Sequence, residues 1–254
     1  MANASITGGN RTARVAAALA WTGVGLALAC GGAELLAGLG YRWGWWHFRS
    51  GIQIMRWSAT ADLAAVALAL AALILAWVYG PRRALAAGAS GLVLSLAVAG
   101  PPLYLWRLVD RLPRIHDIST DTDSPPAYAA VLPLRQGAEN STDYSAEVAP
   151  LQKQAYPDIA PALLELPPAE AYARAERAAR AMGWEIVAAV PAALRIEATD
   201  TTLLFGFKDD VVIRVSAAGS GSRVDVRSLS RVGRSDFGVN ANRIRKFLRQ
   251  LAAG

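Results

Sequence analysis

The sequence predicts a membrane region of three transmembrane helices followed by an α+β soluble domain, in which helices pack on one face of an antiparallel sheet. Three observations lead to this fold class. Residues 1–107 contain three long apolar runs, residues 108–168 are rich in proline, and residues 169–254 alternate between apolar and polar side chains before a final amphipathic stretch. These patterns divide the chain into three parts.

The three apolar runs cover about residues 15–36, 62–80 and 84–106. The hydrocarbon core of a bilayer is about 30 Å thick, and a helix needs about 20 residues to cross it. A helix on the surface of a soluble protein needs one polar side, and none of these runs has one. We therefore expect three membrane spans within a membrane region of residues 1–107.

The positive charge of the chain is concentrated in this membrane region. Residues 1–106 hold seven arginines and only two acids, Glu34 and Asp62, whereas residues 107–254 hold nineteen basic and eighteen acidic residues. Basic residues flank membrane spans and meet anionic head groups. We therefore expect membrane lipid as a partner, and no nucleic acid, because nucleic-acid binding requires a concentrated basic field in the soluble part.

The connection between the first two runs is rich in tryptophan and arginine. Indole rings favour the head-group layer of a membrane, and arginines pair with phosphates there. The sequence favours an interfacial anchor over a docking surface for a lipid, a quinone or a partner subunit. The residues concerned are Arg42, Trp43, Trp45, Trp46, Arg49, Arg56 and Trp57.

Flanking arginines predict the orientation of the membrane region. The positive-inside rule places Arg11, Arg14, Arg82 and Arg83 in the cytoplasm. Three spans then bring the C-terminal domain to the outside. We therefore expect a multi-pass protein of a bacterial inner membrane with its C-terminal domain in the periplasm, although the arginines of residues 42–56 reduce the charge asymmetry.

Residues 108–168 predict an extended segment that wraps the soluble domain. Nine of the thirteen prolines lie between residues 110 and 168, together with many Asp, Ser and Thr residues. Such a composition favours turns and extended chain. We expect anchoring side chains at Tyr128, Val131, Leu132 and Tyr156.

Residues 169–254 predict the α+β core of that domain. Alternation with a period of two indicates half-buried strands, and apolar residues at helical spacing indicate a closing helix. Residues 203–207 and 211–215 form two strands or one bent strand, and Asn240 is the expected N-cap of the closing helix. The expected elements are a helix at 170–182, strands at 184–190, 194–199, 203–207, 211–215 and 223–227, and a helix at 240–251.

Four motifs stand out in the soluble part, at residues 115–126, 197–202, 205–211 and 228–240. These motifs resemble the domain-of-unknown-function family numbered 1499. They occur in the family's order, and the resemblance spans roughly residues 110–252, outside the membrane region. It implies an attachment to bacterial envelopes or a chloroplast address, and it implies no activity.

The residue inventory excludes some kinds of site. Cys30 is the only cysteine, and His47 and His116 are the only histidines. One chain therefore has no disulfide, no cysteine-based metal cage and no site that needs several histidines. We expect no metal and no cofactor.

Three clusters remain as candidates for chemistry. His116, Asp117 and Asp121, with Asp123 nearby, are weak candidates for acid–base catalysis, and turn formation is the simpler explanation. Adjacent carboxylates at residues 209 and 210 point to opposite faces of a strand, so a turn or bulge is favoured there.

The third cluster is a weak candidate for ligand binding. Hydroxyls and arginines before a helix favour an anion, whereas pairing of Arg231 or Arg234 with Asp236, Asp210 or Asp121 is the structural alternative. The residues concerned are Arg231, Arg234, Ser235 and Asp236.

The sequence favours a non-enzymatic, envelope-associated binding module that takes a membrane-protein partner or a small anionic ligand. One alternative is a hydrolase or transferase that uses His116, Asp117 and Asp121. Another alternative is an accessory subunit of a larger membrane complex. The known motifs of serine hydrolases and zinc proteases are absent from the sequence.

Overall fold

The structure, a computed structural model, describes residues 2–79, 82–109 and 111–254. The chain divides into two compact units. The first comprises residues 1–107 with 204–206, and the second comprises residues 108–203 and 207–254. Each unit is described separately below.

The first unit consists of three long helices, α1 (Ala2–Arg42), α2 (Phe48–Tyr79) and α3 (Arg82–Val109). All three are long and apolar enough to cross a membrane, which confirms the predicted number of helices. The helices are longer than the apolar runs, however, so the predicted connection at 41–60 shrinks to residues 43–47. Helical hydrogen bonding continues past the apolar residues until Gly44, which adopts a φ of +76°.

Small residues form the contact between these helices. In α2 the buried positions Asp62, Ala65, Ala69, Ala72 and Ala76 recur at alternating spacings of three and four. Helices gain no hydrophobic driving force against lipid chains, so they associate where small side chains allow close approach. Buried small residues also recur in α1, where steps of three and four join Ala16, Ala20, Gly23, Ala27 and Cys30, and in α3, where such steps join Ala84, Ala87, Gly91, Ser95 and Ala99.

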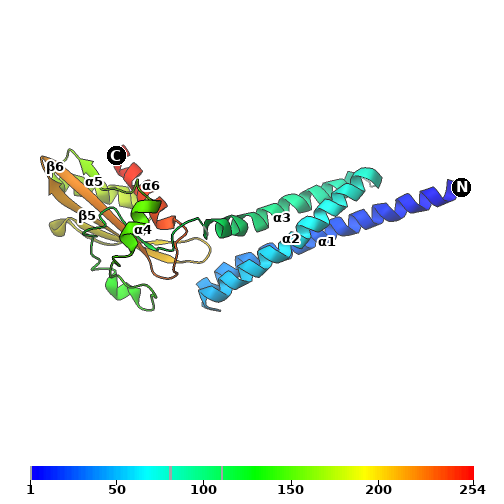
Figure 1. The fold of residues 1–254 in the computed structure, drawn as a ribbon, viewed down its shortest axis with the longest axis horizontal. Helices are drawn as coiled ribbons and strands as arrows, with labels where there is room; N and C mark the ends of the chain where they lie inside the picture. Colours follow the sequence, from blue (N-terminus) through cyan, green and yellow to red (C-terminus); the bar gives the residue numbers. More distant parts are fainter. Residues whose placement is uncertain (1, 80–81, 110) are drawn as a thin grey trace. The chain divides into compact units, whose positions relative to one another are not determined.

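The second unit is an α+β domain (Figure 1). Its elements, in chain order, are β1 (Asp117–Ser119), η1 (Leu132–Arg135), α4 (Val148–Ala155), β2 (Ala162–Leu164), α5 (Pro168–Ala181), β3 (Glu185–Val190), η2 (Pro191–Ala193), β4 (Arg195–Thr201), β5 (Lys208–Ala218), β6 (Gly221–Ser230) and α6 (Val239–Ala253).

The sheet is antiparallel throughout, with the order β1-β6-β5-β4-β3. The short strands β1 and β2 both pair with β6, through Asp117 opposite Leu229 and Ala162 opposite Val224. The predicted strand at 203–207 is wrong, because residues 202–206 form a loop that is closed by the Phe207 amide to the Thr202 hydroxyl at 2.8 Å. β5 instead begins at Lys208 and runs for eleven residues.

One face of the sheet packs against α5 and α6, as predicted (Figure 1). The apolar side chains that alternate along β4, β5 and β6 lie on this face, and Ile196, Ile213 and Val226 are completely buried there. Trp184 stacks on Phe247 of α6 with ring centroids 5.6 Å apart. This face is the hydrophobic core of the domain.

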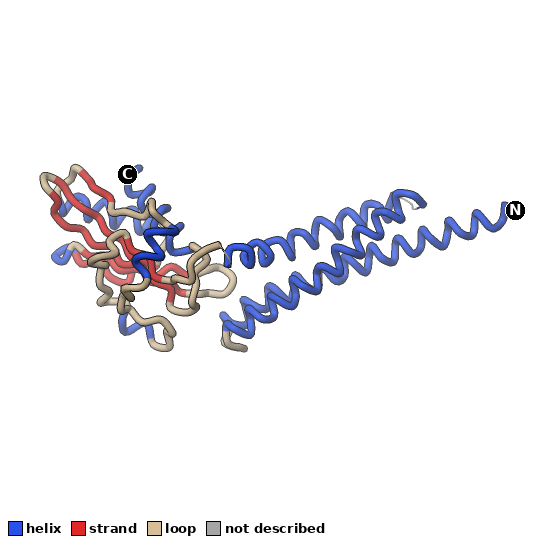
Figure 2. Tube along the Cα trace, viewed as in Figure 1, coloured by secondary structure: helices blue, strands red, loops and turns tan. Residues whose placement is uncertain are grey.

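The opposite face is covered by the chain between β1 and α4, which is drawn mainly as loop in Figure 2. We call residues 120–145 the covering segment. Two of its expected anchors, Tyr128 and Val131, are buried, whereas Leu132 is 45% exposed and is not an anchor. Tyr156, beyond this segment, is buried as expected, within the hydrophobic core.

The N-terminus of α6 differs from the prediction. Gly238, with a φ of +79°, is the N-cap residue, and Asn240 lies inside the helix. The Asp236 carboxylate accepts hydrogen bonds from the amides of Gly238 at 3.0 Å and Asn240 at 2.7 Å. The buried Asn240 side chain instead accepts from the Ser228 hydroxyl at 2.7 Å and donates to the His116 carbonyl at 2.9 Å.

Candidate functional site

The face of the sheet beneath the covering segment is charged, and we call it the charged face. Because side chains alternate along a strand, the residues between the apolar core positions point to this side. Along β6 these residues are Arg223, Asp225 and Arg227, of which Asp225 and Arg227 are buried and Arg223 is partly exposed. The charged face consists of Asp117, Glu197, Thr199, Asp210, Arg214, Arg223, Asp225, Arg227 and Arg231.

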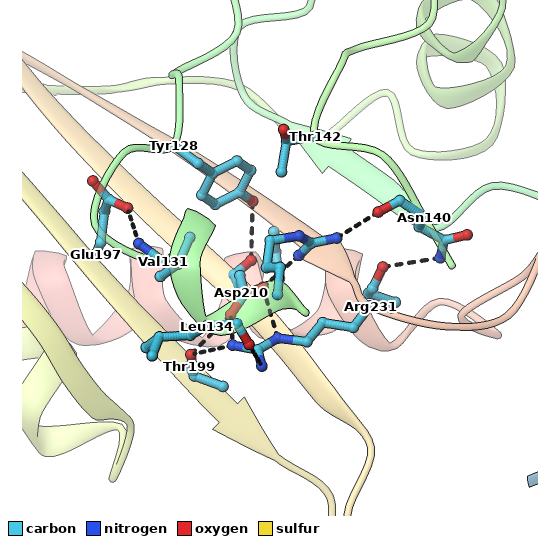
Figure 3. A network of polar contacts seen from close by, with 12 residues as sticks. Tyr128, Val131, Leu134, Asn140, Thr142, Glu197, Thr199, Asp210 and Arg231 are labelled. Carbon is cyan, nitrogen blue, oxygen red and sulfur yellow. Dashed lines mark hydrogen bonds and ion pairs between the residues drawn. The ribbon is translucent and has the colours of Figure 1, made fainter. Parts of the chain in front are cut away.

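Asp210 is the centre of this network (Figure 3). Its side chain has no exposure, and the guanidinium of Arg231 binds it with Nη2 to Oδ1 at 2.8 Å and Nε to Oδ2 at 3.0 Å. Arg135 of the covering segment pairs with Oδ2 from the other side, and the Thr199 hydroxyl donates to Oδ1 at 2.8 Å. One carboxylate therefore holds two guanidinium groups, which fixes η1 on the sheet.

Arg227 forms a second link to the covering segment. Its guanidinium makes a two-point contact with Asp117, at 2.9 and 2.7 Å. It also donates to the Thr142 carbonyl at 2.7 Å and lies 5.0 Å from the ring centroid of Tyr128 and 5.3 Å from that of Tyr144. Burial, with the charge of Asp117, raises the pKa of Tyr144 to about 12. Both phenols are therefore neutral at physiological pH.

Glu197 binds the backbone of the covering segment. Its completely buried carboxylate accepts hydrogen bonds from the amides of Ala129, at 3.0 and 3.1 Å, and Val131, at 3.0 Å (Figure 3). Arg195 lies 2.9 Å away and balances its charge. A carboxylate bonded to main-chain amides specifies the path of the backbone there.

The rim of the charged face carries two carboxylates and two arginines. Asp121 pairs with Arg214 at 2.9 Å and Arg223 at 3.0 Å, and both arginines also pair with Asp225. Burial opposes ionisation of Asp121, but the amides of Ser124 and Asp123 and the two guanidinium groups together outweigh it and lower the pKa of Asp121. Asp121 is therefore held in its charged form by its partners.

The predicted catalytic cluster does not come together. Asp117 binds Arg227 and Asp121 binds the rim arginines, while the ring Nδ1 of His116 lies 3.4 Å from the Arg234 carbonyl. No hydrogen bond joins His116 to either carboxylate in the described part of the chain.

The predicted anion-binding segment lies beside the first cluster. Their backbones adjoin, because the Ser230 amide donates to the His116 carbonyl and the Asp236 amide to the Ile115 carbonyl. Arg231 pairs with Asp210, which was one of the expected structural pairings. The helix N-terminus that favours an anion already holds the carboxylate of Asp236, whose pKa burial raises. The Ser235 hydroxyl accepts from the Phe237 amide at 3.3 Å.

Asp209 and Asp210 point to opposite faces of β5, as the strand geometry predicts. Asp209 reaches the helix face, where Arg243 binds it at 2.6 Å and also binds Asp200 at 2.8 Å. These residues form no turn or bulge, since β5 pairs regularly through both positions. Each carboxylate serves a separate ion pair.

Two acidic residues in the helices have buried carboxylate oxygens that the sequence did not predict. Asp62 was taken as the end of a span, but it lies within α2 and is completely buried, with neither carboxylate oxygen bonded to another described residue. Glu34 likewise has one unbonded buried oxygen. The available sequence signal was the spacing of Asp62 from Ala65 and Ala69, which places it on the small-residue side of α2.

The proposed interfacial residues lie at the end of α1, in the 43–47 connection and in the first ten residues of α2. Trp43, Trp45 and Trp57 are 54%, 61% and 66% exposed, and Arg42, Arg49 and Arg56 are exposed as well. Trp46 is half-buried, and its indole donates to the Ala37 carbonyl at 3.1 Å. One of the four tryptophans therefore closes the turn, and the other three remain on the surface.

Every acidic group of the charged face is paired with an arginine or a main-chain amide. No group of three His, Cys, Asp or Glu residues that could hold a metal ion occurs within residues 2–79, 82–109 and 111–254. These features define a class of protein, an α+β domain attached to three apolar helices that are long enough to span a membrane.

The family follows from comparison with known proteins. The model of the family described as "Protein of unknown function (DUF1499)" matches residues 117–251, which is more than half of the chain. The chain belongs to the DUF1499 family. No curated protein and no solved structure matches it.

We predict that Asp210→Ala lowers the free energy of unfolding of the soluble unit by about 3–5 kcal/mol, because it leaves Arg135 and Arg231 buried without their partner. Hydrogen exchange of the β5 and β6 amides, in the full-length protein in detergent, measures the change. Asp158→Ala is the control, because Asp158 is 54% exposed in its pair with Arg245 and should contribute less than about 1 kcal/mol. Equal effects of the two changes would contradict the central role of Asp210.

We predict that Asp121 makes the domain sensitive to acid. A carboxylate with a lowered pKa stabilises the fold above its unfolded pKa of about 3.9, and the stabilisation is lost as the pH falls through the lower folded value. Asp121→Asn should therefore lower the urea midpoint at pH 7, and the difference from wild type should shrink below about pH 4. A difference that is independent of pH would contradict the assignment.

Proposed function

We propose that the protein is a membrane-anchored binding module without catalytic activity, and that its soluble domain faces the periplasm of a bacterial inner membrane. The observation that carries this proposal is that the candidate catalytic carboxylates are committed to ion pairs. Asp117 is held by Arg227, and Asp121 is held by Arg214 and Arg223. A general acid or base needs a carboxylate that is free to exchange a proton with substrate.

The covering segment supplies a surface for a protein partner. Leu132 and Leu134 of η1 are 45% and 50% exposed. Two contacts with the charged face hold η1 in place: Arg135 pairs with Asp210, and Arg231 donates to the Leu134 carbonyl at 2.6 Å. Loops that a rigid scaffold holds in place are the usual carriers of binding. Adjacent exposed leucines on such a loop favour an apolar contact with another protein.

The membrane region supports a partner within the same membrane. Each crossing of a membrane changes side, so the 43–47 connection and the soluble domain lie on the same side when α1, α2 and α3 all cross. The exposed Trp43, Trp45 and Trp57 fit either lipid head groups or the surface of a membrane protein. An accessory subunit of a membrane complex is therefore a special case of the proposed binding function.

We predict that affinity purification from detergent-solubilised membranes recovers a stoichiometric partner. The double variant Leu132→Ser/Leu134→Ser should lose that partner, because it removes the apolar contact. Leu163→Ser is the matched control, since Leu163 is 74% exposed on β2 and its loss should leave the partner in place. Recovery of the bare monomer by wild type, or equal retention by the two variants, would contradict the proposal.

We predict the orientation from labelling of single cysteines. Cys30 is the only native cysteine, so Cys30→Ser provides a background for Ser220→Cys in the β5–β6 hairpin and Ala13→Cys between two flanking arginines. A membrane-impermeant maleimide should label position 220 once the outer membrane is permeabilised, and position 13 only after the inner membrane is opened. The reverse order would place the soluble domain in the cytoplasm.

A further inference from the structure

One end of the soluble domain carries exposed cations next to the residues that follow α3. The segment of residues 111–116 lies beside the β6–α6 loop, residues 231–238. The Asp236 amide donates to the Ile115 carbonyl at 3.2 Å, and the Ser230 amide donates to the His116 carbonyl at 3.0 Å. Residues far apart in the sequence thus form one continuous surface.

The conformation of the loop is fixed from inside the domain. Asp236 is buried and binds the amides of Gly238 and Asn240, and the Asn140 side chain donates to the Gly233 carbonyl at 2.9 Å. The loop is therefore a formed surface whose exposed side chains have defined positions.

The exposed charges of this surface are mainly positive. Arg111 and Arg114 in the first segment and Arg234 in the loop are exposed, and Lys208 adjoins the loop through the hydrogen bond of its carbonyl with the Arg231 amide at 3.0 Å. These four cations form no ion pair with another described residue. Two acids of this end are bound inside the domain, Asp236 to amides and Asp209 to Arg243. Glu139, whose amide donates to the Arg231 carbonyl at 2.9 Å, is exposed beside the loop, and residue 110 adds one acid in the sequence.

Two apolar side chains accompany the cations. Phe237 is 37% exposed and Val239 is 42% exposed. Phe237 also has a φ of +52°, a left-handed conformation that is costly for a bulky residue. The fold therefore holds an aromatic ring at the surface in a strained conformation, where it contributes no core packing.

The length of chain limits how far this surface can be from a membrane. α3 ends at Val109, and Arg114 follows five residues later. An extended chain spans at most about 3.6 Å per residue, so Arg114 lies within about 18 Å of the end of α3. The β6–α6 loop is hydrogen-bonded to residues 115 and 116, six and seven residues after α3, so its bonded residues lie within about 30 Å of the end of that helix.

We propose that this surface, formed by Arg111, Arg114, Lys208 and Arg234 with Phe237 and Val239, binds the anionic phospholipid head groups of the membrane that α3 crosses. Guanidinium groups pair with lipid phosphates, and an aromatic ring is favoured in the interfacial layer. The surface docks the domain on the bilayer and leaves η1 available to a partner. The inference requires that α3 spans the membrane, and it is independent of the orientation and of the partner proposed above.

The test uses the full-length protein in lipid nanodiscs, in a Cys30→Ser background. A fluorophore is placed at Val239→Cys, on the proposed surface, or at Ser220→Cys, in the hairpin at the other end of β5 and β6. Head-group spin-labelled lipid should quench the label at position 239 more strongly than at position 220. The excess quenching should grow when about a third of the phosphatidylcholine is replaced by phosphatidylglycerol, and it should fall in about 1 M salt.

Charge-removing variants identify the residues responsible. Each basic residue near an anionic surface strengthens association about fivefold, so Arg111→Gln/Arg114→Gln/Arg234→Gln should abolish the lipid dependence of quenching at position 239. Arg177→Gln/Lys246→Gln/Arg249→Gln removes three exposed cations from α5 and α6 and should leave the quenching unchanged. Circular dichroism establishes that all variants are folded. Equal quenching at both positions, or quenching that is indifferent to phosphatidylglycerol or to the first triple variant, would overturn the proposal.

Discussion

The burial of charged groups on one face of the sheet is the constraint on which the soluble unit depends. Asp210, Glu197 and Asp225 have no access to solvent, so each needs a partner from the protein. The covering segment supplies Arg135 to Asp210 and two main-chain amides to Glu197. Buried ion pairs add little net stability relative to apolar packing, because desolvation offsets their attraction. Their effect here is to specify a single path for a segment that is poor in regular structure.

A different constraint applies to the three helices, because helices surrounded by lipid have no hydrophobic driving force for association. They pack through alanines and glycines at spacings of three and four residues, which permits close contact. Asp62 occupies one of these positions and remains completely buried. A buried carboxyl group is costly within a membrane span, which sets Asp62 apart from the small residues at the neighbouring positions.

Much of the fold was predictable because the spacing of apolar residues along the sequence indicates which side of a helix or strand is buried. The apolar runs gave the three helices, and alternation gave the strands and the helix-covered face. The same alternation could not show that the charged residues near Arg227 are buried. A charged strand face that is exposed to solvent has the same local sequence pattern as one that is covered by another segment. The predictions of Leu132 as an anchor and of Asn240 as an N-cap were wrong for a related reason. Each has the residue type of an anchor or a cap, but contacts distant in the sequence decide between these roles.

The sequence by itself determined the architecture: three apolar helices and an α+β domain with helices on one face of an antiparallel sheet. These features follow from local geometry. Only the tertiary structure decided which charges pair, where the catalytic candidates point and which cations remain exposed. Asp117 meets Arg227 across 110 positions of the chain, and Asp121 meets Arg214 across 93. Such pairs are selected by the closed fold, because a charge becomes buried only when every covering element is in place.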